Sequence, residues 1–334
     1  MDNDTNSKPQ STMANSHSHA HSHSHGAEAF LGQSQTPEAR LMRMAALASV
    51  SVASILIILK AVAWWFSGSI SLLGSLTDSS LDLMASVVNF IAIRTALQPP
   101  DEDHRFGHGK AEAISGLMQA MLIMAAAAFL LWESIWRVSS PSPIERSDLA
   151  IGVSVIAIIL TLGLVIFQKH VIARSNSVAI AADNLHYMGD LLMNVAVIAA
   201  IVFATTFDTP WADGAFGIAI ALYIAKAASE IGRSSIDMLM DKEFDQEKRD
   251  LIINTAMETP MVMGIHDLKT RQSGLDSFIQ FHIELPPDMT LKEAHFISDD
   301  VESHIGEKFP NAEIIIHLDP VGIEGPNKTI KEVV

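Results

Sequence analysis

Residues 72–97 read LLGSLTDSSLDLMASVVNFIAIRTAL, an apolar stretch that is interrupted by two carboxylates. A helix needs about 20 mostly apolar residues to cross the hydrocarbon core of a bilayer, and this stretch is long enough. Asp78 and Asp82 lie four positions apart, so a helix places both carboxylates on one face. The same face carries further polar side chains: Ser75, Ser79, Ser86 and Asn89. Because a carboxylate at the bilayer centre costs at least ~3 kcal/mol, a spanning helix with this polar face is expensive unless the face meets a positive group.

A second interrupted stretch, residues 178–206, repeats this arrangement with a histidine. His186 and Asp190 lie four positions apart, and Asp183 precedes them on the same side. One intramembrane carboxylate would fit helix packing or a proton relay equally well, but two matched pairs favour a metal site. One imidazole among three carboxylates favours zinc, iron(II) or cadmium over magnesium or calcium. Two helices together offer four ligands, enough for a tetrahedral shell around a divalent cation: Asp78, Asp82, His186 and Asp190.

Six apolar stretches in all are long enough to cross a membrane. They occupy residues 44–66, 72–97, 113–136, 149–168, 178–206 and 212–232. Lysine and arginine in the short connections gather on one side, which the positive-inside rule places in the cytoplasm together with both termini. This side collects Arg40, Arg43, Arg105, Lys110, Lys169, Arg174, Arg233 and Lys242, whereas the other side offers Arg137 and Arg146. Lys60 lies inside the first stretch, and we expect its amine to snorkel outward beside Trp64 and Trp65.

The composition after Asp241 is that of a soluble domain. Residues 246–259 predict an amphipathic helix, 264–274 and 276–286 two alternating strands, 291–309 a second helix and 312–320 a third strand. The order α-β-β-α-β predicts a small two-layer α+β module with its helices on one face of the sheet. The chain is thereby divided into a leader (1–40), a membrane domain (41–240), a cytoplasmic metal-binding domain (241–320) and a tail (321–334).

The leader is polar and contains HSHAHSHSH at residues 17–25, so we expect it to be a disordered, histidine-rich cytoplasmic segment. The first apolar run starts near Met44, after this leader, and is therefore predicted to be a span and not a cleaved signal. A net charge of −16 argues against a nucleic-acid partner. The chain has no cysteine, so metal ligands must be imidazole and carboxylate.

Two further groups of histidines have spacings that a metal could use. Asp101, His104 and His108 lie in the connection PPDEDHRFGHGKAE, for which a solvated acidic loop is the simpler explanation. In the C-terminal module, His282 projects from the second strand, while His317 and Asp319 share one face of the third. His266 opens the first strand. Of the two histidines on the second helix, His295 and His304, at most one can join such a site, because they point to nearly opposite sides.

The motifs LTDSSLD, DEDHRFGHGKAE, ADNLHYMGDLLMN, GIHDLKTRQSG, IQFHIEL and IIHLDP occur in this order. Together they resemble the cation diffusion facilitator family, and in particular its bacterial zinc and ferrous-iron efflux branch. The resemblance runs from about residue 40 to 320. It implies a homodimer with six transmembrane helices and a ferredoxin-like cytoplasmic domain, located in the cell inner membrane.

The resemblance also implies roles for individual residues. The transport site would consist of Asp78, Asp82, His186 and Asp190. A second, inner-loop site would consist of Asp101, His104 and His108. A cytoplasmic binuclear site would comprise His266, His282, His317 and Asp319, with His295 as an additional ligand. Lys110 and Asp241 would form a charge interlock near the membrane surface.

The implied activity is metal/proton antiport: export of zinc or ferrous iron by alternating access, with cadmium, cobalt and manganese as other candidate substrates. The ligands must lose protons to bind metal, so binding is linked to proton release. No catalytic cofactor is expected. Zinc or iron(II) would be both the substrate and a bound regulatory ion. Protons and membrane lipid would be further partners. A metal-gated channel is the alternative. An intramembrane metalloenzyme is disfavoured, because the sequence lacks an HExxH motif.

Overall fold

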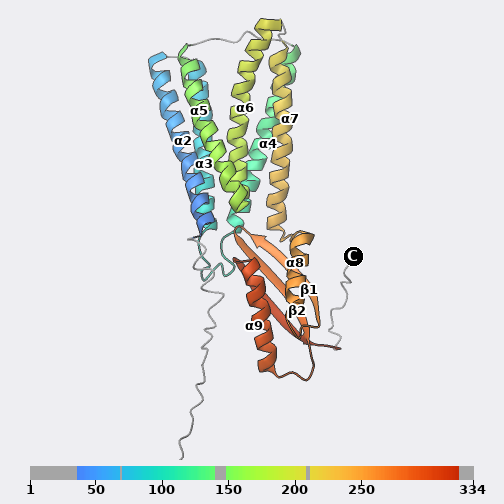
Figure 1. The fold of residues 1–334 in the computed structure, drawn as a ribbon. Helices are drawn as coiled ribbons and strands as arrows, with labels where there is room; N and C mark the ends of the chain where they lie inside the picture. Colours follow the sequence, from blue (N-terminus) through green and yellow to red (C-terminus); the bar gives the residue numbers. More distant parts are fainter. Residues whose placement is uncertain (1–35, 68–69, 140–147, 208–210, 323–334) are drawn as a thin grey trace, which may run out of the picture.

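The computed structural model describes residues 36–67, 70–139, 148–207 and 211–322. The histidines of the leader and the tail after residue 322 lie outside these ranges. Within them, six long helices form a bundle, with a small α+β domain at one end (Figure 1). The bundle consists of α2 (Pro37–Ser67), α3 (Ile70–Ala96), α4 (Lys110–Ser139), α5 (Asp148–Ser175), α6 (Val178–Phe207) and α7 (Ala212–Leu239).

The start of α2 illustrates how local sequence sets a helix boundary. Pro37 is the first helical residue, where its missing N–H costs nothing. Thr36 precedes it, and its Oγ1 accepts a hydrogen bond from the Ala39 backbone N–H at 3.2 Å. The helix therefore includes the last four residues, 37–40, of the segment that was predicted to be the leader.

Within the described residues, α2, α3, α4, α5 and α7 are long and apolar enough to cross a membrane. The fifth predicted span corresponds to α6, a helix of 30 residues that contacts each of the other five. The prediction of a multi-span helical membrane domain is confirmed, while the count of six spans stays a prediction. Small residues let α4 and α7 approach closely, since a Cβ at Gly217 would overlap the Ser134 hydroxyl.

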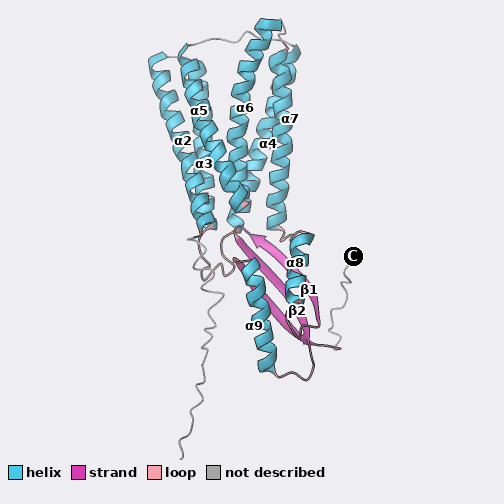
Figure 2. Cartoon of the chain, viewed as in Figure 1, coloured by secondary structure: helices cyan, strands magenta, loops and turns pink. Residues whose placement is uncertain are grey.

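The C-terminal domain has the predicted α-β-β-α-β order, which Figure 2 shows by element type. Its elements are α8 (Gln246–Met257), β1 (Gly264–Ser273), β2 (Asp276–Leu285), α9 (Leu291–Lys308) and β3 (Ala312–Pro320). The sheet order is β1-β2-β3, with β1 antiparallel and β3 parallel to β2. A capping box starts α9, because Thr290 and Glu293 satisfy each other's backbone N–H groups.

Alternation along β2 decides which face of the sheet is covered. Ile279, Phe281 and Ile283 are buried in the core with Ile252 of α8 and Ile305 of α9. The residues between them, including His282, project from the other face. The two helices thus cover one face, and the histidines of the strands lie on the opposite one.

Candidate metal sites

The bundle brings together three of the four predicted transport ligands, from α3 and α6. His186 Nε2 lies 2.9 Å from Asp82 Oδ1 and 3.9 Å from Asp190 Oδ2. One ligand atom from each residue lies within 4.8 Å of the other two. The side chains of Asp82 and His186 are 16% and 28% exposed, so the group is shielded without being sealed. Two carboxylates and an imidazole at this spacing can converge on one small divalent cation.

Asp78 lies one helical turn from Asp82 on α3, is exposed and is not a member of this group. Beside it, Lys60 of α2 donates from Nζ to Ser79 Oγ at 2.6 Å and to the Ser75 carbonyl at 3.2 Å. The amine is thus directed at the polar face of α3, contrary to the expectation that it snorkels outward. A lone lysine inside an apolar run was the only sequence signal of this contact.

Asp183 is buried apart from the group, in a polar network that joins α2, α5 and α6. Ser49 Oγ and Gln168 Nε2 both donate to Asp183 Oδ2, at 2.5 and 2.6 Å. Tyr187, next to His186, shares a 2.8 Å hydrogen bond with Ser86 of α3. These contacts fix the rotation of α6 and so point His186 toward α3. Sequence reasoning missed Ser49 and Gln168, whose signal is a polar residue within an apolar stretch.

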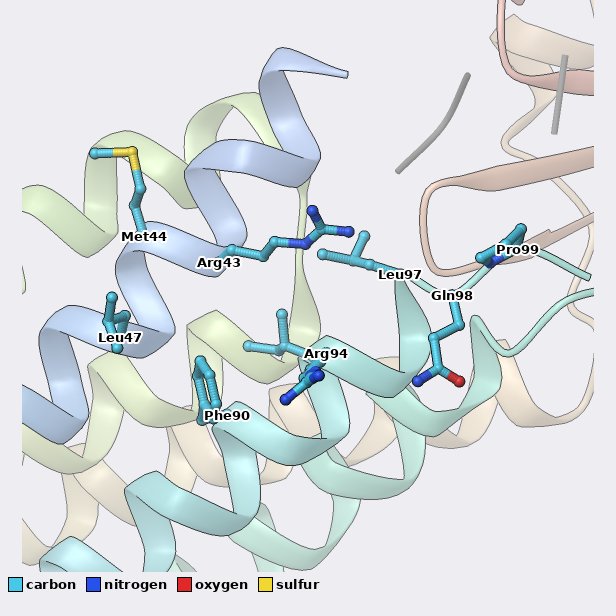
Figure 3. Close-up of a pocket in the computed structure, with 9 residues that line it drawn as sticks. Arg43, Met44, Leu47, Phe90, Arg94, Leu97, Gln98 and Pro99 are labelled. Atoms are coloured by element: carbon cyan, nitrogen blue, oxygen red, sulfur yellow. The ribbon is translucent and has the colours of Figure 1, made fainter. Parts of the chain in front are cut away.

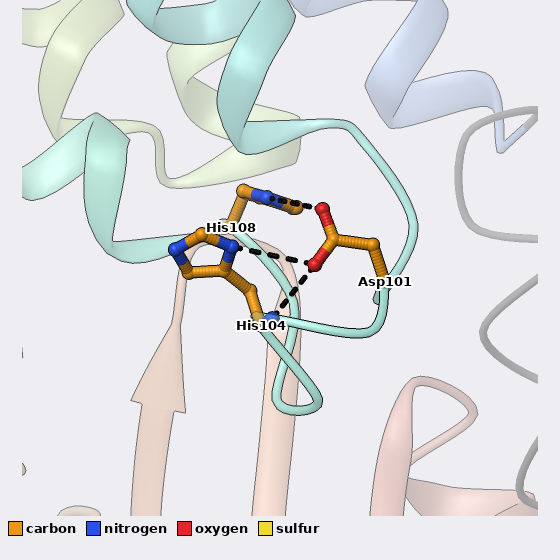
Figure 4. Close-up of side chains that lie close together, drawn as sticks. All are labelled: Asp101, His104 and His108. Atoms are coloured by element: carbon orange, nitrogen blue, oxygen red, sulfur yellow. Dashed lines mark hydrogen bonds and ion pairs between the residues drawn. The ribbon is translucent and has the colours of Figure 1, made fainter.

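The inner-loop residues also meet, between α3 and α4 (Figure 4). Asp101 Oδ1 lies 3.3 Å from His104 Nδ1, and Asp101 Oδ2 lies 3.2 Å from His108 Nε2. The backbone N–H groups of His104 and Asp103 donate to the same carboxylate and lower the pKa of Asp101. Asp101 and His104 are more than half exposed, whereas His108 is 12% exposed. The loop therefore brings together three solvent-accessible candidate ligands.

The strand register aligns three histidines across the sheet of the cytoplasmic domain. His266 is opposite His282, and His282 is opposite His317. Asp319 Oδ2 lies 2.8 Å from His282 Nδ1 and 3.2 Å from His266 Nε2, while its Oδ1 lies 3.3 Å from His317 Nε2. Partial burial acts to raise the pKa of Asp319, but the His282 hydrogen bond and the adjacent imidazoles lower it overall.

Asp267 is a candidate ligand that sequence reasoning missed. The pairing of β1 with β2 is irregular between His266 and Lys269, and Asp267 there has a φ of 51°. This bulge brings an Asp267 carboxylate oxygen within 4.8 Å of ligand nitrogens of His266 and His282. Strict alternation along the strand would have placed it on the opposite face from His266.

His295 does not join this cluster in its own chain. It lies on α9, which packs on the other face of the sheet, and its Nδ1 is 3.4 Å from Asp299 Oδ1. His304 lies on the same helix, 4.0 Å from Asp300. The predicted role of His295 as an additional ligand stays a prediction.

The residues of the predicted interlock are in contact. Lys110 Nζ, at the start of α4, lies 2.9 Å from Asp241 Oδ1, just after α7. Arg271 of β1 approaches the other oxygen of Asp241 at 3.5 Å. Its guanidinium lies over the rings of Phe106 and Phe278, at 4.9 and 4.5 Å from their centroids. Two membrane helices and the sheet therefore converge on one carboxylate.

Comparison with known proteins identifies the family of the chain. A family model described as the cation efflux transmembrane domain matches residues 46–240, and one for the cytoplasmic domain of cation efflux proteins matches residues 244–321. The cation-efflux pump FieF of Shewanella oneidensis is 48% identical over 283 residues, which cover 85% of this chain and 95% of that protein. FieF of Yersinia enterocolitica is 43% identical over 285 residues, with the same coverage of both chains.

Among solved structures, CzrB in its Zn form aligns with 25% of this chain and 98% of its own, at 31% identity and a TM-score of 0.24. The metal-bound C-terminal domain of CzcD from Thermotoga maritima aligns with 25% of this chain at 23% identity and a TM-score of 0.24. Two family models that together span most of the residues from 46 to 321 decide the assignment. The chain belongs to the cation diffusion facilitator family and is a multi-pass membrane protein of metal cation efflux.

Proposed function

We propose that this protein exports zinc or iron(II) from the cytoplasm in exchange for protons, through a site formed by Asp78, Asp82, His186 and Asp190. The observation that carries the proposal is the contact of His186 with Asp82, which joins α3 and α6 inside the bundle. Carboxylates and imidazole must be deprotonated to bind a metal, so a change in protonation can load or release the ion. A proton gradient can thereby drive metal transport.

Alternating access accounts for the positions of the ligands. Asp82, His186 and Asp190 are already grouped, whereas Asp78 lies one turn away beside Lys60. A small rotation of α3 against α6 would bring Asp78 into the shell or remove it, changing the number of ligands during the cycle. A tight shell of four ligands suits occlusion of the ion better than the rapid conduction of a channel.

The remaining groups are assigned to regulation. We infer that the cytoplasmic domain (residues 241–320) binds metal at His266, His282, His317 and Asp319, and that the inner loop binds metal at Asp101, His104 and His108. His295 would contribute from a second copy in a homodimer, since it faces away from the cluster of its own chain. The membrane domain (residues 41–240) would lie in the cell inner membrane. Both termini of the chain would then be in the cytoplasm.

The test is transport by the purified protein in proteoliposomes with an imposed pH gradient. Asp82→Ala should abolish metal-coupled proton flux, because it removes the link between the two helices. Ser80→Ala is the matched control, since Ser80 lies on the same helix, is exposed and donates a hydrogen bond to the Leu76 carbonyl of that helix. Persistent coupled flux in Asp82→Ala would refute the site. Saturable uptake that follows the pH gradient would separate a carrier from a channel.

A further inference from the structure

A groove of about 610 Å³ opens between α2 and α3, at the end of the bundle next to the cytoplasmic domain. Arginines line it together with apolar side chains from both helices (Figure 3). Arg43 and Leu47 come from α2, and Phe90 and Arg94 come from α3. Neither the transport site nor the cytoplasmic cluster uses any of these residues. The groove is therefore a separate feature of the membrane domain.

On both helices, an arginine near the cytoplasmic end is followed by an apolar side chain one turn deeper in the bundle. On α2, which enters the membrane from this end, Leu47 lies one turn deeper than Arg43. On α3, which returns to this end, Phe90 lies one turn deeper than Arg94. With the bundle spanning a bilayer, each wall would place a cation toward the lipid headgroups and an apolar side chain toward the hydrocarbon.

Both guanidinium groups are available to a ligand. Arg43 and Arg94 are exposed, and no carboxylate among the described residues forms an ion pair with either of them. Met44 and Leu47 are 57% and 55% exposed beside them. A guanidinium binds phosphate oxygens through paired N–H donors, and two such groups in one groove attract an anion strongly.

We propose that this groove binds an anionic phospholipid of the cytoplasmic leaflet. Its phosphate would lie between Arg43 and Arg94, and an acyl chain would run over Leu47 and Phe90. The two arginines complement a negative charge, and the apolar side chains deeper in the groove fit an acyl chain. A soluble anion would make no use of these apolar side chains, so the groove favours an anionic lipid. Basic pockets between helices at the cytoplasmic surface suit anionic headgroups in this way. A bound lipid would clamp the ends of α2 and α3, the helix that carries Asp82.

The experiment measures lipid binding to the full-length, delipidated protein in detergent, by native mass spectrometry and by the shift in melting temperature. Phosphatidylglycerol and phosphatidylcholine with identical acyl chains are compared, and inorganic phosphate is a third arm. We expect phosphatidylglycerol to bind and stabilise the protein more than phosphatidylcholine. The double variant Arg43→Gln/Arg94→Gln should bind phosphatidylglycerol about 10-fold or more weakly, since each basic residue contributes to headgroup attraction.

Matched variants keep the result interpretable. Arg174→Gln removes an exposed arginine at the same end of α5, outside the groove, and should leave binding unchanged. Arg43→Lys/Arg94→Lys keeps both charges and should retain most of the binding, which separates lost charge from misfolding. If the Arg43→Gln/Arg94→Gln double variant does not fold, the binding of phosphatidylglycerol is measured on the two single variants. Equal loss in Arg174→Gln, an equal response to phosphate alone, or a groove covered by a second copy in cross-linking would overturn the proposal.

Discussion

Gly109, the residue before α4, lies directly against Gly274, in the turn between β1 and β2. A Cβ built on Gly274 would lie 3.1 Å from the Gly109 Cα, and one on Gly109 would overlap the Ser273 carbonyl. Gly274 also has a φ of +62°, which favours glycine. The membrane domain and the cytoplasmic sheet therefore meet backbone to backbone, one residue from the Lys110–Asp241 ion pair.

We predict that Gly109→Ala loosens this junction. The added methyl group must displace the turn, and overpacking of this kind costs about 1–3 kcal/mol. The melting temperature should fall, and hydrogen exchange of the turn at residues 273–275 should speed up. Gly163→Ala is the control, because nothing lies within 4 Å of a Cβ there and alanine favours its helix. If exchange of the turn did not change in Gly109→Ala, the contact would not hold the two domains together.

The second prediction concerns the pH dependence of stability. Asp276, at the start of β2, is 7% exposed, and burial together with the nearby Glu313 raises its pKa to about 7. Between its usual value of 3.8 and about 7, the folded chain binds more protons at this site than the unfolded chain. The site's contribution to stability is therefore present at low pH, is lost as pH rises through this window, and changes no further above it.

Asp276→Asn should accordingly stabilise the protein at pH 8, by up to ~3 kcal/mol, and flatten the decline in stability between pH 5 and 7. Melting temperatures of the full-length protein across this range provide the measurement. Asp288→Asn, at an exposed position in the same domain, should leave the slope as it is. A steeper slope in Asp276→Asn would mean that the carboxylate is stabilised in its charged form.

The polar stripes of the membrane domain could be predicted from spacing, because helical periodicity decides which residues share a face. Asp82, His186 and Asp190 meet as expected. Spacing says nothing, however, about the rotation of one helix against another, so it could not show that Asp78 lies outside the group. That rotation depends on buried contacts such as Ser86 with Tyr187, between residues far apart in the chain.

In the cytoplasmic domain, alternation predicted that His282 leaves the core face of β2, and pairing with β1 and β3 aligned it with His266 and His317. A bulge at Asp267 interrupts the alternation of side chains between the two faces of the sheet, and the residue pattern did not predict it. The helix carrying His295 could have covered either face of the sheet. Which face it covers depends on the tertiary packing of Ile305 and its neighbours.

The third prediction is that Asp319 is the main determinant of metal binding by the cytoplasmic cluster, because its carboxylate contacts all three histidines. Asp319→Ala should weaken zinc binding there at least ~10-fold, as loss of ligands or of their partners generally does. Equilibrium dialysis of the full-length protein in an Asp82→Ala background removes the transport site from the measurement. Asp288→Ala is the control in the same domain. Zinc affinity equal to that of the background protein would show that the histidines bind without Asp319.

The final prediction concerns which metal the membrane site selects. His186 supplies the single nitrogen ligand, and its Nε2 is the atom nearest to Asp82. His186→Asp would convert the shell to oxygen alone, which suits manganese better than zinc. The ratio of zinc to manganese transport should fall by ~10-fold or more, measured by competition in proteoliposomes. His304→Asp, at an exposed position of α9, makes the same chemical change outside the membrane and should leave the ratio unaltered. An unchanged ratio in His186→Asp would mean that selectivity is set by the size of the site, with the nitrogen ligand dispensable.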